Sequence, residues 1–191
     1  MVTRDRILHA ALACFTEKGF TATTVSEIRT RSGASVGSIY HHFEDGKQGI
    51  AAAVYTDAVA DYQSGLSAAL RRRPGAEDGL RALVGHHLRW VHRDPDRARY
   101  LLSRREPEVV QATAERRRAL NRASFAELEE WYRAHASAGR LREVPLDIVY
   151  SVTIGPAQEF CRHWLAGRTA TPIGDAERAL ADAAWRALAP G

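Results

Sequence analysis

Residues 24–43, TVSEIRTRSGASVGSIYHHF, contain the signals for two short helices joined by a tight turn. Thr24 and Glu27 form a T-x-x-E capping box, in which each side chain accepts a hydrogen bond from the other residue's backbone amide, so we expect a helix to begin after Thr24. Gly33 supplies the positive φ that ends a helix, and Ser35 is placed to cap the next one. The stretch therefore predicts a helix-turn-helix.

The second of these helices is expected to have one apolar and one polar side. The apolar side would carry residues spaced by three and four: Val36, Ile39, Tyr40 and Phe43. The polar side would carry small or hydrogen-bonding groups with no acid among them: Ser35, Ser38, His41 and His42. Since the second helix of a helix-turn-helix enters the DNA major groove, we expect this helix to read DNA.

These residues resemble the DNA-binding domain of the TetR family of bacterial transcriptional repressors, whose pattern is roughly T-x-x-x-I-A-x-x-A-G-V-S-x-G-x-x-Y-x-H-F-x-x-K. The positions that match are Thr24, Ile28, Gly33, Ser35, Gly37, Tyr40, His42 and Phe43. Lys47 nearly matches, because the link before it is one residue longer than usual. Arg29 stands where the family has a small residue, and Ser32 and Ala34 replace its Ala and Val.

The resemblance implies a set of DNA contacts. The Tyr40 hydroxyl would bind a phosphate, and Thr24 and Lys47 would be two further backbone clamps at helix N-termini. Arg29 would either reach a phosphate or lie on the surface without a role. The predicted DNA-binding residues are Thr24, Arg29, Ser35, Val36, Ser38, Tyr40, His41, His42 and Lys47. The alternative is that Tyr40 is a core aromatic and the histidines are merely solvated.

Composition and charge describe an ordinary globular chain. Its 191 residues are 45% hydrophobic and 26% charged, which suffices for one sizeable domain or two small ones. The net charge of +4 is modest, and residues 1–48 carry six basic against five acidic side chains. The prediction of DNA binding therefore depends on where groups are placed and not on bulk charge.

Cysteine usage and hydropathy indicate the compartment. Cys14 and Cys161 are too few and too far apart for a disulfide framework or a zinc site, so we expect two small apolar fillers. No apolar run approaches membrane-spanning length, and no N-terminal stretch has the pattern of a signal peptide. We therefore expect a cytoplasmic protein with no membrane partner.

Helical periodicity continues along the chain and predicts an all-α protein. The expected helices are 4–18, the two of the helix-turn-helix, 47–73, 77–93, 96–104, 107–138, 146–166 and a last one capped by Asp175. Residues Leu8, Ala11, Leu12 and Phe15 would pack the first helix on the helix-turn-helix. The predicted domains are a three-helix DNA-binding head, 1–47, and a helical bundle for ligand binding and dimerisation, 48–191.

The bundle contains aromatic and polar residues that predict a ligand cavity. Apolar walls with a few polar groups are typical of such sites. The candidate ligand-binding residues are His87, Trp90, Trp131, His135, Gln158 and Cys161. The alternative is core packing for the aromatics and surface exposure for most histidines.

Neither a metal site nor an active site is predicted. His87 and His92 are five residues apart and so lie on different sides of a helix, and His86 has Arg89 and Trp90 at the spacings where a second ligand would stand. The chain lacks G-x-S-x-G, a phosphate-binding glycine loop and H-E-x-x-H. We expect no cofactor and no enzyme, although an enzyme built on a helical bundle is a rival interpretation.

The last two predicted helices resemble the pair through which TetR-family subunits dimerise. The segment 146–165 is apolar nearly all round, and the helix after it is striped with Leu180, Trp185 and Leu188, which is more apolar surface than one small body readily hides. The resemblance implies a homodimeric repressor that binds a roughly palindromic operator and is released by a small molecule. The remaining alternatives are an activator and a helical ligand-binding or adaptor protein that no longer binds DNA.

Overall fold

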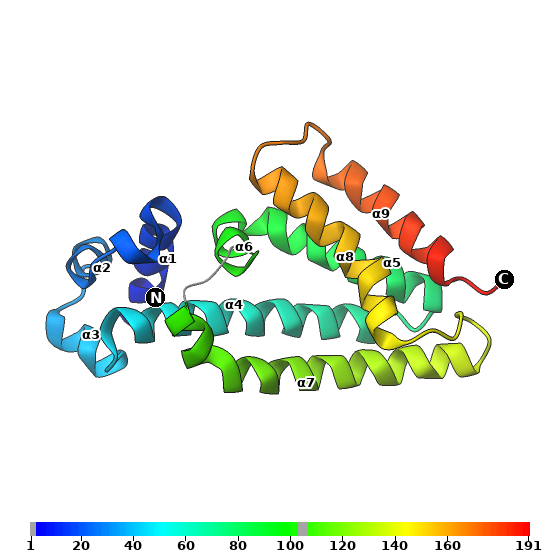
Figure 1. The fold of residues 1–191 in the computed structure, drawn as a ribbon, viewed down its shortest axis with the longest axis horizontal. Helices are drawn as coiled ribbons and strands as arrows, with labels where there is room; N and C mark the ends of the chain where they lie inside the picture. The colour runs from blue at the N-terminus through cyan, green and yellow to red at the C-terminus, as the bar shows by residue number, and fades with distance from the viewer. Residues whose placement is uncertain (1–2, 103–106) are drawn as a thin grey trace. The chain divides into compact units, whose positions relative to one another are not determined.

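The computed structural model describes residues 3–102 and 107–191, and all regular secondary structure in these residues is α-helical (Figure 1). The all-α prediction is therefore confirmed. The helices are α1 Thr3–Ala22, α2 Val25–Ser32, α3 Val36–His42, α4 Gly46–Arg71, α5 Ala76–Arg93, α6 Pro95–Leu102, α7 Pro107–Ser137, α8 Leu146–Leu165 and α9 Ile173–Leu188.

The chain divides into two compact units. The first comprises residues 1–60 and 96–119, and the second comprises residues 61–95 and 120–191. Helices α4 and α7 each contribute residues to both units. The helix-turn-helix lies wholly in the first unit, while the domain boundary at residue 47 stays a prediction.

In the first unit, α1 packs on α2 and α3 through one buried face. Ile7, Ala11 and Phe15 lie at the centre of that face, while Leu8, predicted to belong to it, is only half-buried. The core is completed by fully buried residues from the following helices: Ile28, Ile39, Ile50 and Ala58. Gly19 has non-helical dihedral angles (φ 80°, ψ 166°), so the regular part of α1 ends where the sequence predicted.

Helix α6 is held on the first unit by Tyr100. Its ring stacks on that of Phe15 with centroids 5.7 Å apart, and its hydroxyl donates a hydrogen bond to the carbonyl of Ala51 at 3.2 Å. The helix begins at Pro95, one residue before the expected bound at 96, and proline is favoured at the first position of a helix. Its predicted end at residue 104 lies outside the described residues.

In the second unit, α5 packs against both α8 and α9, and α8 and α9 lie side by side (Figure 1). The main core of this unit contains Leu66, Leu70, Leu80, Leu83, Leu128, Tyr132, Leu141, Val149, Ile154 and Leu188. Of the helices that the structure describes, none is both long enough and apolar enough to cross a membrane.

The start of α9 differs from the prediction. Asp175 was expected to cap the helix, but the N-cap position is occupied by Pro172 and the helix begins at Ile173. Asp175 instead lies in the first turn, where its carboxylate pairs with Arg178 three residues later. The reason is that proline fixes its own φ near the helical value and favours a helix start, so the helix begins before the acid.

One close approach shapes the core of the second unit. A Cβ atom at Gly79 of α5 would lie 2.2 Å from Cζ2 of Trp131 in α7, which is closer than real contacts allow. Glycine at this position therefore lets the indole of Trp131 lie directly against the backbone of α5. The sequence alone gives no sign of this contact, because the two residues are far apart in the chain.

Candidate DNA-binding interface and interior site

The helix-turn-helix has the local geometry that its sequence predicts. The amide of Glu27 donates to the Thr24 hydroxyl at 3.2 Å, and the amide of Thr24 donates to the Glu27 carboxylate at 2.9 Å, which completes the capping box. Gly33 has φ 66° and ends α2, and its amide donates to the Arg29 carbonyl at 3.0 Å. Ser35 caps α3 by accepting from the Ser38 amide at 3.1 Å.

The exposed surface of α3 is wider than predicted. Ile39 and Phe43 are buried, but Val36 and Tyr40, assigned to the same apolar side, are 57% and 48% exposed, so the four residues do not share one buried face. In a helix of seven residues the buried stripe spans a single turn, from Ile39 to Phe43. Val36, in the first turn, and Tyr40, at the edge of the stripe, both remain outside it. The exposure of Tyr40 also excludes the alternative that it is a core aromatic.

The other residues proposed for DNA contact lie on the same unit. Thr24, Arg29, Ser35, His41 and His42 are exposed, and Ser38 is half-buried. The side chains of α3 that reach solvent therefore include two imidazoles, a phenol and an isopropyl group, with no carboxylate on the helix itself. Such a face can donate to phosphates and bases, and an apolar group on it can contact the methyl of thymine.

Lys47 is already fully engaged within the protein. Its ammonium donates to the carbonyls of Phe20 at 2.9 Å, Thr21 at 3.3 Å and Thr23 at 2.9 Å, and lies 4.5 Å from the centre of the Phe20 ring. Since an ammonium has three N–H donors, a contact with a DNA phosphate would require one of these bonds to be exchanged. The geometry shows a residue that joins the start of α4 to the end of α1; its contact with DNA stays a prediction.

Two ion pairs join α1 to α2 beside this interface. Lys18 pairs with Glu27, and Arg31 pairs with Glu17 at 2.7 Å. The hydrogen bond from Lys18, together with those from the Thr24 amide and hydroxyl, lowers the pKa of Glu27 to about 2. The Glu27 carboxylate is therefore ionised at neutral pH, which keeps the capping box intact.

In the second unit, a half-buried tyrosine and a buried histidine form an interior site. The Tyr62 hydroxyl lies 2.9 Å from Nδ1 of His87, and the His87 side chain is only 3% exposed. The Nε2 atom of His87 is buried and has no hydrogen-bond partner in the described structure. Burial lowers the pKa of His87 to about 4, so its imidazole is neutral at neutral pH. We call Tyr62 and His87 the interior site.

Trp90 lies against this site but has its own polar partner. Its ring is 5.3 Å from that of Tyr62 in an edge-on arrangement. Its Nε1–H donates to the Asp61 carboxylate at 2.7 Å, and the same oxygen accepts from Arg93 at 2.7 Å. The Trp90 side chain is therefore held in place by this hydrogen bond, and it has no further donor to offer a ligand.

Trp131 and His135 form a separate group. Their rings are 4.6 Å apart, and Nδ1 of His135 accepts from the guanidinium of Arg140 at 2.9 Å. Trp131 lies against Gly79, which precedes His87 by eight residues, or about 12 Å along a helix at 1.5 Å per residue. The Trp131 Nε1–H is buried and has no hydrogen-bond partner among the described residues.

Cys161 and Gln158 both lie on α8. Cys161 is fully buried, and burial raises the pKa of its thiol to about 12, so it is an inert thiol. Burial strongly raises the pKa of Tyr62, and the nearby Tyr150 and Cys161 raise it further. Gln158 accepts from the Tyr150 hydroxyl at 3.5 Å. The six predicted ligand residues thus divide between the interior site, α8 and the group at Gly79.

Two residues with possible roles at these sites, Tyr62 and Tyr150, were not predicted as site residues from the sequence. Tyr62 pairs with a residue 25 positions away, so no local spacing indicates it, whereas Tyr150 pairs with Gln158 eight residues later in the same helix. The signal that could have found Tyr62 is a polar hydroxyl within an otherwise apolar helix face, which needs a partner when buried.

Residues 7–54 match the family model described as "Bacterial regulatory proteins, tetR family". The chain is 28% identical over 151 residues to the HTH-type transcriptional repressor AcnR of Corynebacterium diphtheriae, covering 78% of this chain and 73% of that protein. It is also 42% identical over 45 residues to the HTH-type transcriptional repressor KstR2 of Mycolicibacterium smegmatis, covering 24% and 22% of the two chains.

The fold is similar over nearly the whole chain to that of a solved regulator. The transcriptional regulator FadR from Bacillus subtilis, solved in complex with stearoyl-CoA, matches with a TM-score of 0.79 and 16% identity, covering 94% of this chain and 96% of that one. The similarity of the sequence is thus strongest where the helix-turn-helix lies, and that of the fold extends into the body. The capped helix-turn-helix and the matched family model show that residues 7–54 resemble the DNA-binding domain of bacterial regulatory proteins of the tetR family, and the chain as a whole shares the helical fold of a solved regulator.

Proposed function

We propose that this regulator is a repressor that binds a palindromic operator as a homodimer and releases it when a small molecule enters the body. The observation that carries the proposal is the exposed, acid-free surface of α3, held in place by the capping box and the turn at Gly33. Relatives named as repressors, AcnR and KstR2, support repression over activation. Because its partner is DNA, we also propose that the protein acts in the cytoplasm.

On DNA, the residues of α3 would divide between positioning and reading. The Tyr40 hydroxyl would donate to a phosphate, which fixes the register of the helix but carries no base information. Ser35, His41 and His42 would meet base edges or phosphates, and Val36 would contact a thymine methyl. Arg29 and Thr24, both exposed, would bind the DNA backbone at the end and the start of α2.

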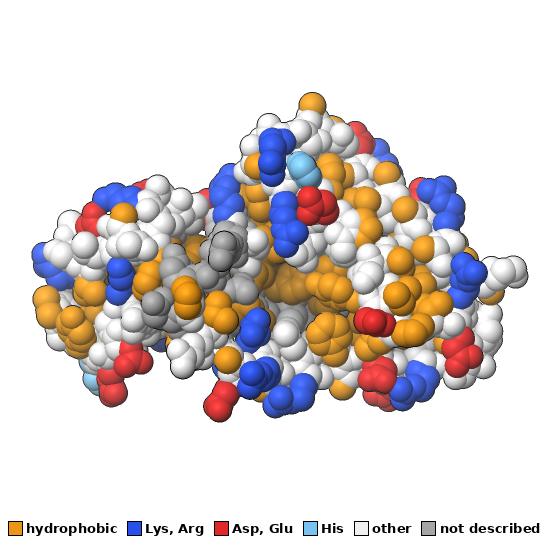
Figure 2. All heavy atoms as spheres, viewed as in Figure 1, with side chains coloured by type: hydrophobic (Ala, Val, Ile, Leu, Met, Phe, Trp, Pro, Cys, Tyr) orange, Lys and Arg blue, Asp and Glu red, His pale blue; other side chains and the backbone are white. Residues whose placement is uncertain are grey.

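The proposed homodimer is formed by α8 and α9. Hydrophobic side chains gather over α8 in Figure 2, and Ile148 at the start of this helix is 46% exposed. Such a surface on a monomer is normally covered by a partner. Two copies related by a twofold axis would present two α3 helices to half-sites about one DNA turn apart, which accounts for a palindromic operator.

The proposed effector binds at the interior site. Tyr62, Trp90 and Cys161 would offer mainly apolar surfaces to such a molecule, and the unpartnered Nε2 of His87 would supply the polar contact. When Tyr62 donates to Nδ1 of the neutral imidazole, Nε2 carries the proton and can donate to a ligand oxygen. The effector is thus proposed to be an apolar molecule with a carbonyl or carboxylate group.

Release of DNA follows from differential binding. An effector that binds better to a conformation whose two α3 helices no longer fit adjacent major grooves shifts the population away from the DNA-binding form. The stearoyl-CoA bound to FadR from Bacillus subtilis supports an acyl-chain effector only at the level of the shared fold. The alternative function, a ligand-binding or adaptor protein without DNA affinity, is tested by the same experiment.

The test is fluorescence anisotropy of the full chain on labelled DNA from upstream of its own gene, with a non-specific duplex as competitor and a titration of salt. We expect tight binding that survives the competitor and weakens steeply as salt rises. If this DNA shows no preference, a selection from random sequences follows. A selection that enriches no sequence would overturn the proposal and favour the adaptor.

A further inference from the structure

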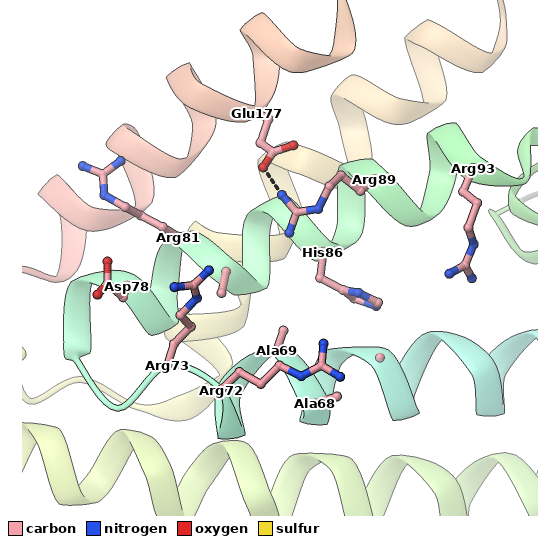
Figure 3. A pocket seen from close by; sticks show the side chains of 12 residues that line it. Ala68, Ala69, Arg72, Arg73, Asp78, Arg81, His86, Arg89, Arg93 and Glu177 are labelled. Atoms are coloured by element: carbon pink, nitrogen blue, oxygen red, sulfur yellow. Dashed lines mark hydrogen bonds and ion pairs between the residues drawn. The ribbon is translucent and has the colours of Figure 1, made fainter.

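The second unit contains a basic cavity that the proposed function does not use. It has a volume of about 630 Å³ and lies between the C-terminal part of α4 and α5, with one residue from α9. Figure 3 shows its lining, which consists of Gly65, Ala68, Ala69, Arg72, Arg73, Asp78, Arg81, Ala82, His86, Arg89, Arg93 and Glu177. This volume is within the usual range of small-molecule sites, about 300–1,000 Å³.

Three of the five arginines in the lining have carboxylate partners. Arg81 pairs with Glu77 and Asp182, Arg89 with Glu177, and Arg93 with Asp61. Each guanidinium has five N–H donors, so these pairs leave some donors of every arginine unused. The paired arginines are held in place by their carboxylates and can still contact a ligand.

Arg72 and Arg73 differ from the other three. Both are exposed, and neither has an ion-pair partner within the described part of the chain. Their backbone is fixed at the end of α4, because the amide of Arg72 donates to the Ala68 carbonyl at 3.3 Å and that of Arg73 to the Leu70 carbonyl at 3.0 Å. Two positive charges are therefore held at one edge of the cavity without being neutralised.

Small residues keep the cavity open. Gly65, Ala68 and Ala69 on α4 face Ala82 on α5, so no long apolar side chain fills the space between the two helices. A Cβ atom at Gly65 would lie 2.3 Å from Cε1 of His86, so His86 depends on this glycine for its position. Burial lowers the pKa of His86, so the positive charge of the cavity comes from its arginines.

We infer that this cavity binds a small molecule that carries phosphate groups, with Arg72 and Arg73 as the main phosphate ligands. The planar guanidinium fork matches a phosphate in a bidentate fashion, and charged hydrogen bonds of this type are about twice as strong as neutral ones. Arg89 lies across the cavity and supplies a further donor (Figure 3).

The carboxylates in the lining restrict the class of ligand. Asp78 and Glu177 would repel an extended polyanion such as nucleic acid, because successive phosphates would approach them. A small phosphorylated molecule instead can place its phosphates at Arg72 and Arg73 and direct hydroxyl or amino groups toward Asp78. The inference does not depend on DNA binding or on the interior site.

The test is isothermal titration of the full chain with inorganic pyrophosphate at low ionic strength. We expect one pyrophosphate per chain, and a loss of affinity of at least about tenfold in the double variant Arg72→Gln/Arg73→Gln, since two charged hydrogen-bonding groups are removed. The matched control is Arg116→Gln/Arg118→Gln, which removes the same charge from exposed positions of α7 in the first unit and should bind as the wild type does.

A second variant tests the cavity itself. Ala69→Glu leaves Arg72 and Arg73 in place but adds a carboxylate to the lining of the cavity, and it should weaken pyrophosphate binding to a similar degree. An equal loss of affinity in the Arg72→Gln/Arg73→Gln variant and in the α7 control would mean that pyrophosphate binding follows net charge, and the inference would be wrong. It would also be wrong if the wild type bound no pyrophosphate at millimolar concentration.

Discussion

The helix-turn-helix and the interior of the body differ in how far apart their bonded residues lie along the chain. In the helix-turn-helix, Thr24 and Glu27 are three residues apart, as are Ser35 and Ser38. In the body, Tyr62 and His87 are separated by 25 residues, and Gln63 and Asn121 by 58. Local bonds form with the helix that contains them, whereas distant ones exist only when the whole core is assembled.

This difference has a functional consequence. A surface fixed by local caps keeps its shape when neighbouring elements move, which suits a helix that must present the same side chains to DNA. A site fixed by distant contacts changes when its helices shift, which suits a site that responds to a ligand. Substitutions in the two regions should therefore differ in size and in the conditions that reveal them.

The largest effect is expected from the core that supports the interior of the body. Leu83→Ala removes a side chain that is almost completely buried on α5, and we expect the free energy of unfolding to fall by about 3 kcal/mol through lost transfer energy and a residual cavity. Urea unfolding followed by circular dichroism measures this. Leu180→Ala, on the half-buried side of α9, should cost clearly less. Equal losses at the two positions would contradict the assignment of Leu83 to the core.

The next effect depends on pH. The pKa of His87 is lowered in the folded protein from 6.5 to about 4, so between these values the unfolded chain binds more protons and stability falls as pH falls. Relative to pH 8, the wild type should lose about 2 kcal/mol at pH 5 from this residue alone. Urea unfolding of wild type and His87→Gln at both pH values measures the difference. The variant should lose less on acidification, and parallel losses would show that His87 does not titrate as described.

A smaller effect is expected from the local cap. Thr24→Ala removes the acceptor for the Glu27 amide, and we expect a loss of about 1 kcal/mol in the free energy of unfolding. Thr30→Ala is the matched control, because Thr30 lies exposed in the same helix and its hydroxyl bonds only the Ser26 carbonyl. That control should be neutral or slightly stabilising, since alanine favours a helix. If Thr30→Ala lost as much stability as Thr24→Ala, the loss could not be attributed to the capping box.

The smallest effect concerns DNA. Tyr40→Phe removes one hydroxyl from the exposed face of α3, and we expect the affinity to fall by about threefold to tenfold on operator and non-specific DNA alike. Anisotropy on both duplexes measures this, with Tyr150→Phe in the body as the control that removes the same atom elsewhere. A loss confined to one base position of the operator would assign Tyr40 to base reading instead.

The features that could be predicted from the sequence are those that depend on local contacts. The caps at Thr24 and Ser35 and the turn at Gly33 depend on residues within a few positions, so they could be predicted. The width of the packed stripe on α3 could not, because helical periodicity indicates a side of the helix but not how much of that side is buried. The helix start at Pro172 was missed because two valid start signals, a proline and an acid, lie three residues apart.

The candidate sites were less predictable than the fold. His87 and Trp90 were named from their helix face, but their partners Tyr62 and Asp61 come from another helix. Trp131 was grouped with them, although the space at Gly79 gives it a different location. The arginine cavity was overlooked because Arg71 to Arg73 look like a solvated run until the small residues of α4 and α5 are placed opposite them.

The three hydrogen bonds of Lys47 make the end of α1 and the start of α4 a single mechanical joint. Any tilt of the first turn of α4 must carry the last carbonyls of α1 with it, because breaking the joint would leave an ammonium and several carbonyls without partners. Helix α4 also supplies Tyr62 to the interior site. The same continuous helix therefore contains both the Lys47 joint, at its first turn, and Tyr62 of the interior site.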